Sequence, residues 1–338
     1  MSRKFIFFTF PVALVVAIYF IGPVPASSVW DQAVITVPSG VSELEQYIAM
    51  QESLHKLKPD NEARIIWADS TKSKTAVSVV YLHGFSASQK EGDPIHLQFA
   101  KEFGCNLYLA RLADHGVDTT EQLLYFNSDR WWRSAKEALS IGKAIGEKVI
   151  IMSTSTGGTM AIMLAAEFPA DVHAMINMSP NIAVNDPNAW MLNNPWGLQI
   201  ARLVLGSNYK EIQYDSARQI YWNGKYRIES LVQLEEMIED KMITSTFEKV
   251  KSPSLTLYYY KNENEQDPTV KVSAMLEMNS QLGTPAALKV AVPIPAAGNH
   301  VLGSYLVPGD LKSVYRESKK FAVEKLDMKP VITSSQTP

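Results

Sequence analysis

The chain has 338 residues, of which 46% are hydrophobic and 20% charged, and its formal net charge is −3. This composition is typical of a globular protein with a sizeable core, and the charge gives no reason to expect nucleic acid as a partner. The chain has one cysteine, Cys105, which excludes an intramolecular disulfide and a cysteine-based zinc site. We expect Cys105 to be a buried packing residue rather than a reactive thiol.

The amino terminus has the features of an export signal. Two basic residues precede an uncharged apolar run, 5–21, and Val24 and Ala26 then form a small-x-small exit. The run is longer than the roughly 7–15 residues of a typical signal but shorter than the roughly 20 of a membrane helix. A cleaved signal peptide and a retained membrane anchor therefore both stay open, with Pro11 in the run favouring cleavage. A buried core helix is disfavoured because it would need no flanking charges. Both open readings place the rest of the chain outside the cytoplasm, as a periplasmic, secreted or membrane-anchored protein.

Strands and helices alternate through most of the remaining chain. Short apolar runs rich in β-branched residues indicate the strands, and apolar side chains at helical spacing indicate the helices. The alternation predicts an α/β fold with a mainly parallel, doubly wound sheet and helices on both faces. The expected elements are a helix at 41–57, strands at 64–68 and 76–82, a helix at 94–103, a strand at 106–111, a helix at 129–145, a strand and helix within 149–168, a strand at 173–178, and then a strand at 255–260, a helix at 269–282, a strand at 288–294 and a helix at 310–326.

One stretch interrupts this alternation. Residues 185–246 show no strand pattern, are rich in Trp and Tyr, and contain one amphipathic helical stripe. Because the alternating pattern resumes afterwards, we interpret the stretch as a helical cap inserted in the core rather than as a separate domain. The chain then divides into a signal peptide or anchor (1–26), an N-terminal helical extension (27–63), an α/β core (64–184 and 247–326), the helical cap (185–246) and a flexible tail (327–338).

The most informative stretch leads from an apolar strand directly into a small-residue helix. It reads Val149-Ile-Ile-Met-Ser-Thr-Ser-Thr-Gly-Gly158. A serine on such a tight strand-to-helix turn is exposed as a nucleophile, usually in the pattern G-x-S-x-G. Ser155 fits as the nucleophile, with small residues, Ser153 and Gly157, two positions away on either side. The alternative frame, with Ser153 as nucleophile, would place bulky Ile151 at a crowded position.

A serine nucleophile needs a base, and the base needs an orienting acid. Of the six histidines, His300 alone follows a late strand, which is where the order Ser, Asp, His requires the base. Asp267 is the expected acid because it ends the loop after the preceding strand, although it could equally be an ordinary cap of a helix starting at Pro268 or Thr269. Glu263 and Glu265 are interpreted as solvated loop charges.

Two backbone amides are expected to stabilise a developing oxyanion. One belongs to Thr156, the residue after the nucleophile, and the other to Phe85, in the turn after an earlier strand. Gly84 lets the backbone approach the site closely, and His83 is interpreted as a structural turn residue. No metal or cofactor is expected.

Four elements follow one another along the chain: His83-Gly84-Phe85, the elbow at 153–157, Asp267-Pro-Thr-Val270 and Gly298-Asn-His300. In this order they resemble the α/β-hydrolase superfamily, and in particular the capped lipase and esterase branch with monoacylglycerol lipases and serine-aminopeptidase-like hydrolases. The resemblance extends over about 64–326 and includes an imperfect match of Ala113-Asp-His-Gly116 to a Gly-His-Gly loop. Ser153 departs from the usual first glycine of the motif. A serine at the nucleophile position argues against haloalkane dehalogenase chemistry, and a turn without further glycines argues against the His-Gly-Gly-Gly esterases.

The resemblance implies a serine hydrolase that cleaves carboxylic esters, with a small-molecule or lipid ester as substrate and an apolar acyl chain suggested by the aromatic cap. A serine aminopeptidase is the alternative, in which acidic cap residues receive a free amine. The residues in question, Glu235, Glu236, Glu239 and Asp240, are more simply explained as the solvated face of a helix. A non-catalytic binding protein on the same scaffold is the third hypothesis.

Overall fold

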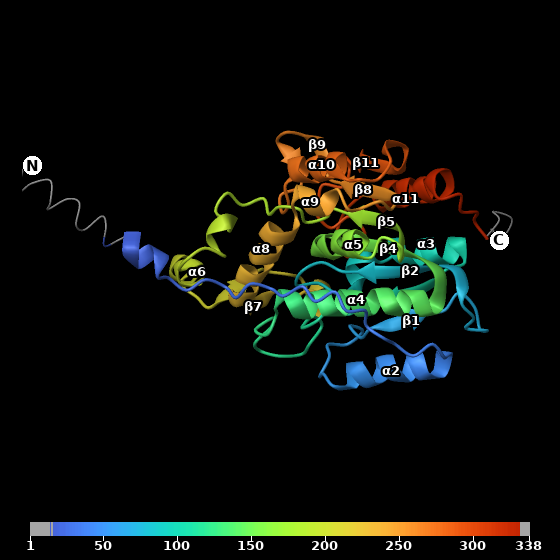
Figure 1. Ribbon diagram of the computed structural model, residues 1–338, viewed down its shortest axis with the longest axis horizontal. Helices are drawn as coiled ribbons and strands as arrows, with labels where there is room; N and C mark the ends of the chain where they lie inside the picture. The colour runs from blue at the N-terminus through green and yellow to red at the C-terminus, as the bar shows by residue number, and fades with distance from the viewer. Residues whose placement is uncertain (1–13, 15, 332–338) are drawn as a thin grey trace, which may run out of the picture.

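The computed structural model describes residue 14 and residues 16–331 of the chain. Its centre is a seven-stranded sheet with the order β1-β3-β2-β4-β5-β8-β11 (Figure 1). Neighbouring strands are parallel except β1, which runs antiparallel to β3, so the predicted mainly parallel sheet is confirmed. The strands are β1 (Arg64–Ile66), β2 (Thr75–Leu82), β3 (Asn106–Leu109), β4 (Gly146–Thr154), β5 (Val172–Met178), β8 (Ser254–Tyr258) and β11 (Lys289–Pro293).

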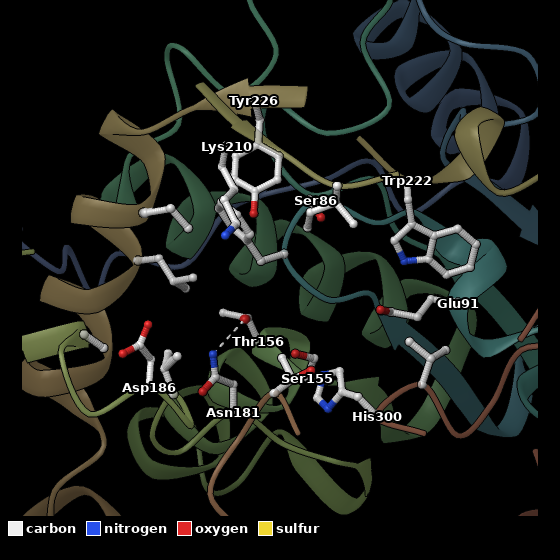
Figure 2. Close-up of a pocket in the computed structure, with 18 of the residues that line it drawn as sticks. Ser86, Glu91, Ser155, Thr156, Asn181, Asp186, Lys210, Trp222, Tyr226 and His300 are labelled. Atoms are coloured by element: carbon white, nitrogen blue, oxygen red, sulfur yellow. Dashed lines mark hydrogen bonds between the residues drawn. The ribbon is translucent and has the colours of Figure 1, made fainter. Parts of the chain in front are cut away.

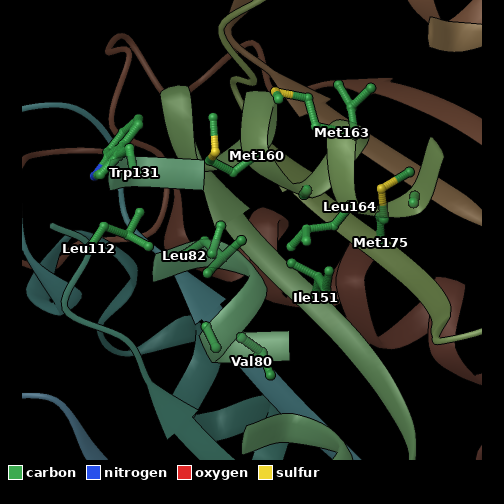
Figure 3. Close-up of a cluster of buried hydrophobic side chains, with 14 of the residues drawn as sticks. Val80, Leu82, Leu112, Trp131, Ile151, Met160, Met163, Leu164 and Met175 are labelled. Atoms are coloured by element: carbon green, nitrogen blue, oxygen red, sulfur yellow. The ribbon is translucent and has the colours of Figure 1, made fainter. Parts of the chain in front are cut away.

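Helices cover both faces of this sheet because its central strands are apolar on both sides. Along β2, Val80 and Leu82 pack into one buried cluster, and Val79 and Tyr81 pack into the other. Figure 3 shows the first cluster, in which α4 and α5 cover the sheet. The helices on this face include α4 (Ser128–Ile145), α5 (Thr156–Glu167) and α10 (Val272–Gln281), and those on the other face include α3 (Ile95–Phe103) and α11 (Leu311–Lys325).

The segment between β5 and β8 forms a cap beyond the carboxyl ends of the strands (Figure 1). It is mostly helical, and it also holds two short strands that the sequence pattern did not indicate. Two three-residue strands pair as an antiparallel hairpin inside it. Each of these strands has one tyrosine and two charged residues, which leaves no apolar run to detect. The cap elements are a 3₁₀ turn (Ala189–Met191), α6 (Gly197–Leu205), β6 (Tyr209–Glu211), α7 (Ser216–Tyr221), β7 (Lys225–Arg227), α8 (Glu229–Lys241) and α9 (Thr244–Phe247).

Two helix starts or ends differ from expectation. The helix expected from 269 begins at Val272, so Asp267 does not cap it. The first helix of the extension, α2 (Val41–Ser53), ends before His55, and residues 23–39 run as irregular chain along the core.

Of the predicted leader and tail, residues 1–13, 15 and 332–338 lie outside the described part. None of the described helices is long and apolar enough to cross a bilayer.

Three shorter elements complete the fold and lie in the connections. They are a 3₁₀ turn at Gln89–Gly92, a small hairpin of β9 (Tyr260–Asn262) and β10 (Glu265–Gln266), and a 3₁₀ turn at Ala286–Leu288.

Candidate active site

Ser155 lies on a sharp turn between β4 and α5. Its backbone has φ 53° and ψ −122°, a conformation that L-residues rarely adopt and that is characteristic of a nucleophile elbow. The turn is held on both sides, since the Ser155 amide donates to Met178 O at 3.0 Å and the Asn181 amide donates to Ser155 O at 2.9 Å. At Gly157, a Cβ atom would lie 2.1 Å from Leu82 O, so glycine is required there. These contacts fix the hydroxyl at the carboxyl edge of the sheet.

The structure accounts for Ser153, the residue that departs from the usual glycine. Its hydroxyl donates to Asn177 Oδ1 at 2.7 Å, and both residues are fully buried. Asn177 lies on β5, directly across from Ser153 in the parallel ladder. The serine is therefore paired inside the core and ties the two strands that carry the elbow.

Asp267 and His300 are in direct contact. His300 Nδ1 lies 2.7 Å from Asp267 Oδ2, and Asp267 Oδ1 accepts the amides of Thr269 and Val270 at 2.9 and 3.1 Å. Burial would raise the pKa of Asp267, but His300 and the two amides outweigh it and lower that pKa. Although Asp267 is only 1% exposed, its lowered pKa keeps it ionised, and it holds the imidazole with its Nδ1 proton toward the carboxylate.

The other ring nitrogen of His300, Nε2, is buried and has no hydrogen-bond partner among the described residues, and the residue shares a cavity with Ser155. Figure 2 shows the imidazole beside Ser155. Burial would lower the pKa of His300, but the Asp267 carboxylate outweighs it and, with a smaller contribution from Glu91, raises that pKa. An imidazole held in this way can act as a general base.

The two amides expected to bind an oxyanion are free. Within the described part of the chain, neither the Phe85 amide nor the Thr156 amide donates to a protein group. Three neighbouring amides are engaged: Gly84 donates to Glu91 Oε2, Ser86 donates to His115 Nε2, and Ser155 donates to Met178 O. Phe85 and Thr156 also line the same cavity as Ser155.

Two buried histidines support the loop that carries Phe85. His83 Nε2 accepts the Leu112 amide at 3.0 Å and Nδ1 contacts Gly84 O at 2.8 Å, while His115 Nε2 accepts the Ser86 amide at 2.9 Å. Burial lowers the pKa of His83 to about 4 and places that of His115 well below its usual range. Both rings are thus neutral and act as hydrogen-bonding supports.

A buried carboxyl group without a motif in the sequence, that of Glu91, lies near Ser155 and His300. Glu91 is 3% exposed, lines the cavity, and accepts the Gly84 amide at 2.6 Å. A Cβ placed on Gly84 would lie 2.9 Å from both Glu91 Oε2 and Ser155 Cβ, which shows how closely these groups meet. Burial raises the pKa of Glu91 to about 7. Figure 2 shows it on the same side of the cavity as His300 and Trp222.

The cavity has a volume of about 460 Å³ and lies between the sheet edge and the cap. Glu235, on α8, is buried and lines it, so the solvated-face interpretation is wrong for this residue. Burial, together with Glu239 and Asp186, raises the pKa of Glu235 to about 7. Most other lining side chains from the cap are apolar or aromatic: Ala189, Leu192, Ile212, Tyr214, Trp222, Tyr226, Leu231 and Leu234.

The remaining candidates lie away from the site. Glu263 and Glu265 are exposed, and Glu265 pairs with Lys261 at 2.8 Å. Cys105 is buried, and burial raises the pKa of its thiol to about 12. Across residues 14 and 16–331, no three His, Cys, Asp or Glu side chains are grouped to hold a metal ion.

Comparisons with known proteins give structural neighbours but no sequence relatives. No protein-family model matches the chain, and no curated protein matches it. A solved structure from work on LipS and LipT, two metagenome-derived lipolytic enzymes, aligns with a TM-score of 0.61 at 15% identity and covers 80% of this chain and 100% of its own. The monoacylglycerol lipase of Paleococcus ferrophilus aligns at 0.58 with 11% identity over 78% of this chain and 98% of its own.

A third neighbour is a soluble variant of the monoglyceride lipase of Saccharomyces cerevisiae in complex with a substrate analogue. It aligns with a TM-score of 0.58 at 14% identity and covers 78% of this chain and 91% of its own. At such low identity the likeness concerns the fold. The chain has the α/β-hydrolase fold, which these lipolytic enzymes share.

Proposed function

We propose that this protein is a serine hydrolase that cleaves carboxylic esters through an acyl-enzyme. The observation that carries the proposal is the convergence, in one cavity, of an elbow serine, a histidine fixed by a buried aspartate, and two unpaired amides. These are the parts that acyl transfer by serine requires.

The geometry supports a two-step reaction. In the first step His300 Nε2 accepts the Ser155 proton, Oγ attacks the ester carbonyl, and the amides of Phe85 and Thr156 bind the oxyanion. His300 then gives its proton to the departing alcohol, which leaves the acyl group on Ser155. In the second step water loses a proton to His300 and attacks the acyl-enzyme, which releases the carboxylic acid and restores Ser155.

The cavity supports an ester with an apolar acyl chain. Its volume of about 460 Å³ is within the range of small-molecule sites, and the cap wall above Ser155 is largely apolar. Tyr226 and Trp222 are themselves buried, so their rings offer rigid surface next to the reacting groups. A lipid ester or a smaller apolar ester would both fill this space.

One observation favours amide substrates as a second candidate. Glu235 is 6% exposed, makes no hydrogen bond or ion pair with a described residue, and faces the cavity with Asp186. An aminopeptidase would use such a carboxylate to receive the free amine of its substrate. In an esterase, Glu235 would instead be held protonated by its surroundings.

A substrate panel separates these functions. We expect the protein to hydrolyse p-nitrophenyl esters of graded chain length. In Ser155→Ala the kcat should fall by at least about 10³-fold, because the nucleophile is removed. Ser273→Ala, at an exposed position on α10, is the matched control and should keep full activity. The aminopeptidase would be established instead if the protein hydrolysed aminoacyl amides faster than esters and if Glu235→Gln lowered the rate of amide hydrolysis. No turnover of either class would favour a binding protein.

A further inference from the structure

Helix α6 has a broad apolar face that lies on the surface. Of its nine residues only Gly197 is buried, while Leu203 and Val204 are 82% and 77% exposed. Its polar residues are Gln199 and Arg202, and Arg202 pairs with Glu229 of α8 at 2.5 Å. The apolar face of an amphipathic helix normally packs against a core. In the described part of the chain nothing covers its outer face.

The N-terminal segment lies directly beside α6. Trp196, which precedes the helix, donates its amide to Pro23 O at 3.0 Å and its indole Nε1 to Ile18 O at 2.9 Å. Figure 1 shows the first described turn of the chain next to α6, at the end of the molecule remote from α11. Exposed apolar side chains of both segments gather at this end of the molecule, which we call the apolar end: Phe20, Ile21, Val24, Ile200, Leu203, Val204 and Leu205.

The chain that follows this segment is fixed to the core. Asp129, at the start of α4, accepts the amides of Val29 and Trp30, both at 2.9 Å. Lys136 is 3% exposed and donates to the carbonyl oxygens of Asp31 and Ala33 at 2.6 and 2.8 Å. The position of the N-terminal segment beside α6 is thus held both at Trp196 and along α4.

We propose that the apolar end docks on a lipid bilayer in the chain that retains residues 1–26. The uncharged apolar run at 5–21 ends at this surface, and such a run partitions into membranes. The chain would leave the bilayer after Ile21, and Pro23, two residues later, is bonded to Trp196. This bond would keep α6 at the lipid surface. Trp196 itself is of the residue type that is enriched at membrane interfaces.

Docking would bring the substrate cavity close to the membrane. Helix α6 packs against β6 and α8, and both elements line the cavity through Lys210, Leu231 and Leu234. An apolar ester could then pass from the bilayer to Ser155 along the cap. The docking surface itself does not depend on the proposed chemistry.

Site-specific fluorescence tests the proposal on the full chain. Cys105 is buried, so a cysteine introduced at an exposed position can be labelled selectively with an environment-sensitive NBD dye. We would label Leu203→Cys and Phe20→Cys, with Val323→Cys on α11 as the matched control, because Val323 is also exposed but lies far from the apolar end. Intact mass would verify that residues 1–26 are present, and the proteins would be reconstituted in phosphatidylcholine–phosphatidylglycerol vesicles.

We expect the labels at positions 203 and 20 to shift to shorter emission wavelengths on vesicles and to lose emission when lipids with brominated chains are used. The label at position 323 should show neither change. Quenching at position 20 without quenching at 203 would overturn the proposal, because only the leader would then enter lipid. A label at 203 that is already shielded without vesicles, and that brominated lipid does not quench, would also overturn it. That result would mean that residues 1–13 or a second copy cover α6.

Discussion

At the residue scale, Glu91 is the group whose effect on the proposed chemistry is easiest to measure. Glu91 and Asp267 both lie near His300, and the negative charge of each carboxylate favours the protonated imidazole. Protonated His300 cannot accept the Ser155 proton, so kcat/KM should fall as the pH falls through a pKa that lies above the usual value for histidine. A profile that is flat from pH 5 to 8 would contradict His300 as the base.

Glu91→Gln should move that acidic limb to lower pH. The amide keeps an oxygen to accept the Gly84 N–H, but it removes the negative charge that helps to hold the proton on His300. Glu248→Gln, at an exposed position, is the control and should leave the limb where it is. Superimposable profiles for wild type and Glu91→Gln would show that Glu91 does not influence the base.

Ser153 gives a second prediction at this scale, one of stability. Ser153→Ala removes the donor to Asn177 Oδ1 in a fully buried site, so the free energy of unfolding should fall by about 1–3 kcal/mol. Chemical denaturation would measure it, with exposed Ser273→Ala as the reference. An unfolding free energy equal to that of wild type would show that the hydrogen bond contributes nothing net.

At the element scale, the junction of β4 with α5 depends on close backbone approach. A methyl group at Gly157 would meet Leu82 O at 2.1 Å, and this oxygen belongs to the end of β2 and cannot move independently. Gly157→Ala should therefore lower the free energy of unfolding by about 1–3 kcal/mol and reduce activity through displacement of Ser155. In the control, Gly309→Ala, the nearest atom is 3.4 Å away. Equal stability of the two variants would contradict the tight-turn explanation.

Elements with strong local patterns were predictable from the sequence, and those that depend on tertiary contacts were not. The runs that became β2, β4 and β5 are apolar because both faces of the sheet are covered. The hairpin of β6 and β7 was missed because each strand has only three residues, two of which are charged. The late start of α10 was missed because Asp267 and Pro268 have the composition of a helix start.

At the scale of the whole molecule, the order of the motifs was sufficient to predict which side chains meet. The strands that precede Ser155, Asp267 and His300 are parallel, so their carboxyl ends share one edge of the sheet. No motif in the sequence indicates that Glu91 or Glu235 lies at the cavity. Glu91 is placed there by its contact with Gly84, and Glu235 lines the cavity from the cap. The same holds for Lys136, a mid-helix lysine whose partners lie more than a hundred residues earlier.

The measurement that tests the central claim most directly is covalent capture of the nucleophile in the full chain. A fluorophosphonate phosphonylates a serine activated by a neighbouring histidine, and peptide mass spectrometry locates the adduct. We predict one adduct per chain, on Ser155, absent in Ser155→Ala and strongly slowed in His300→Gln, whose side chain cannot accept the proton. A chain that is not modified, or a Ser155→Ala variant that is modified as fast as wild type, would contradict the account.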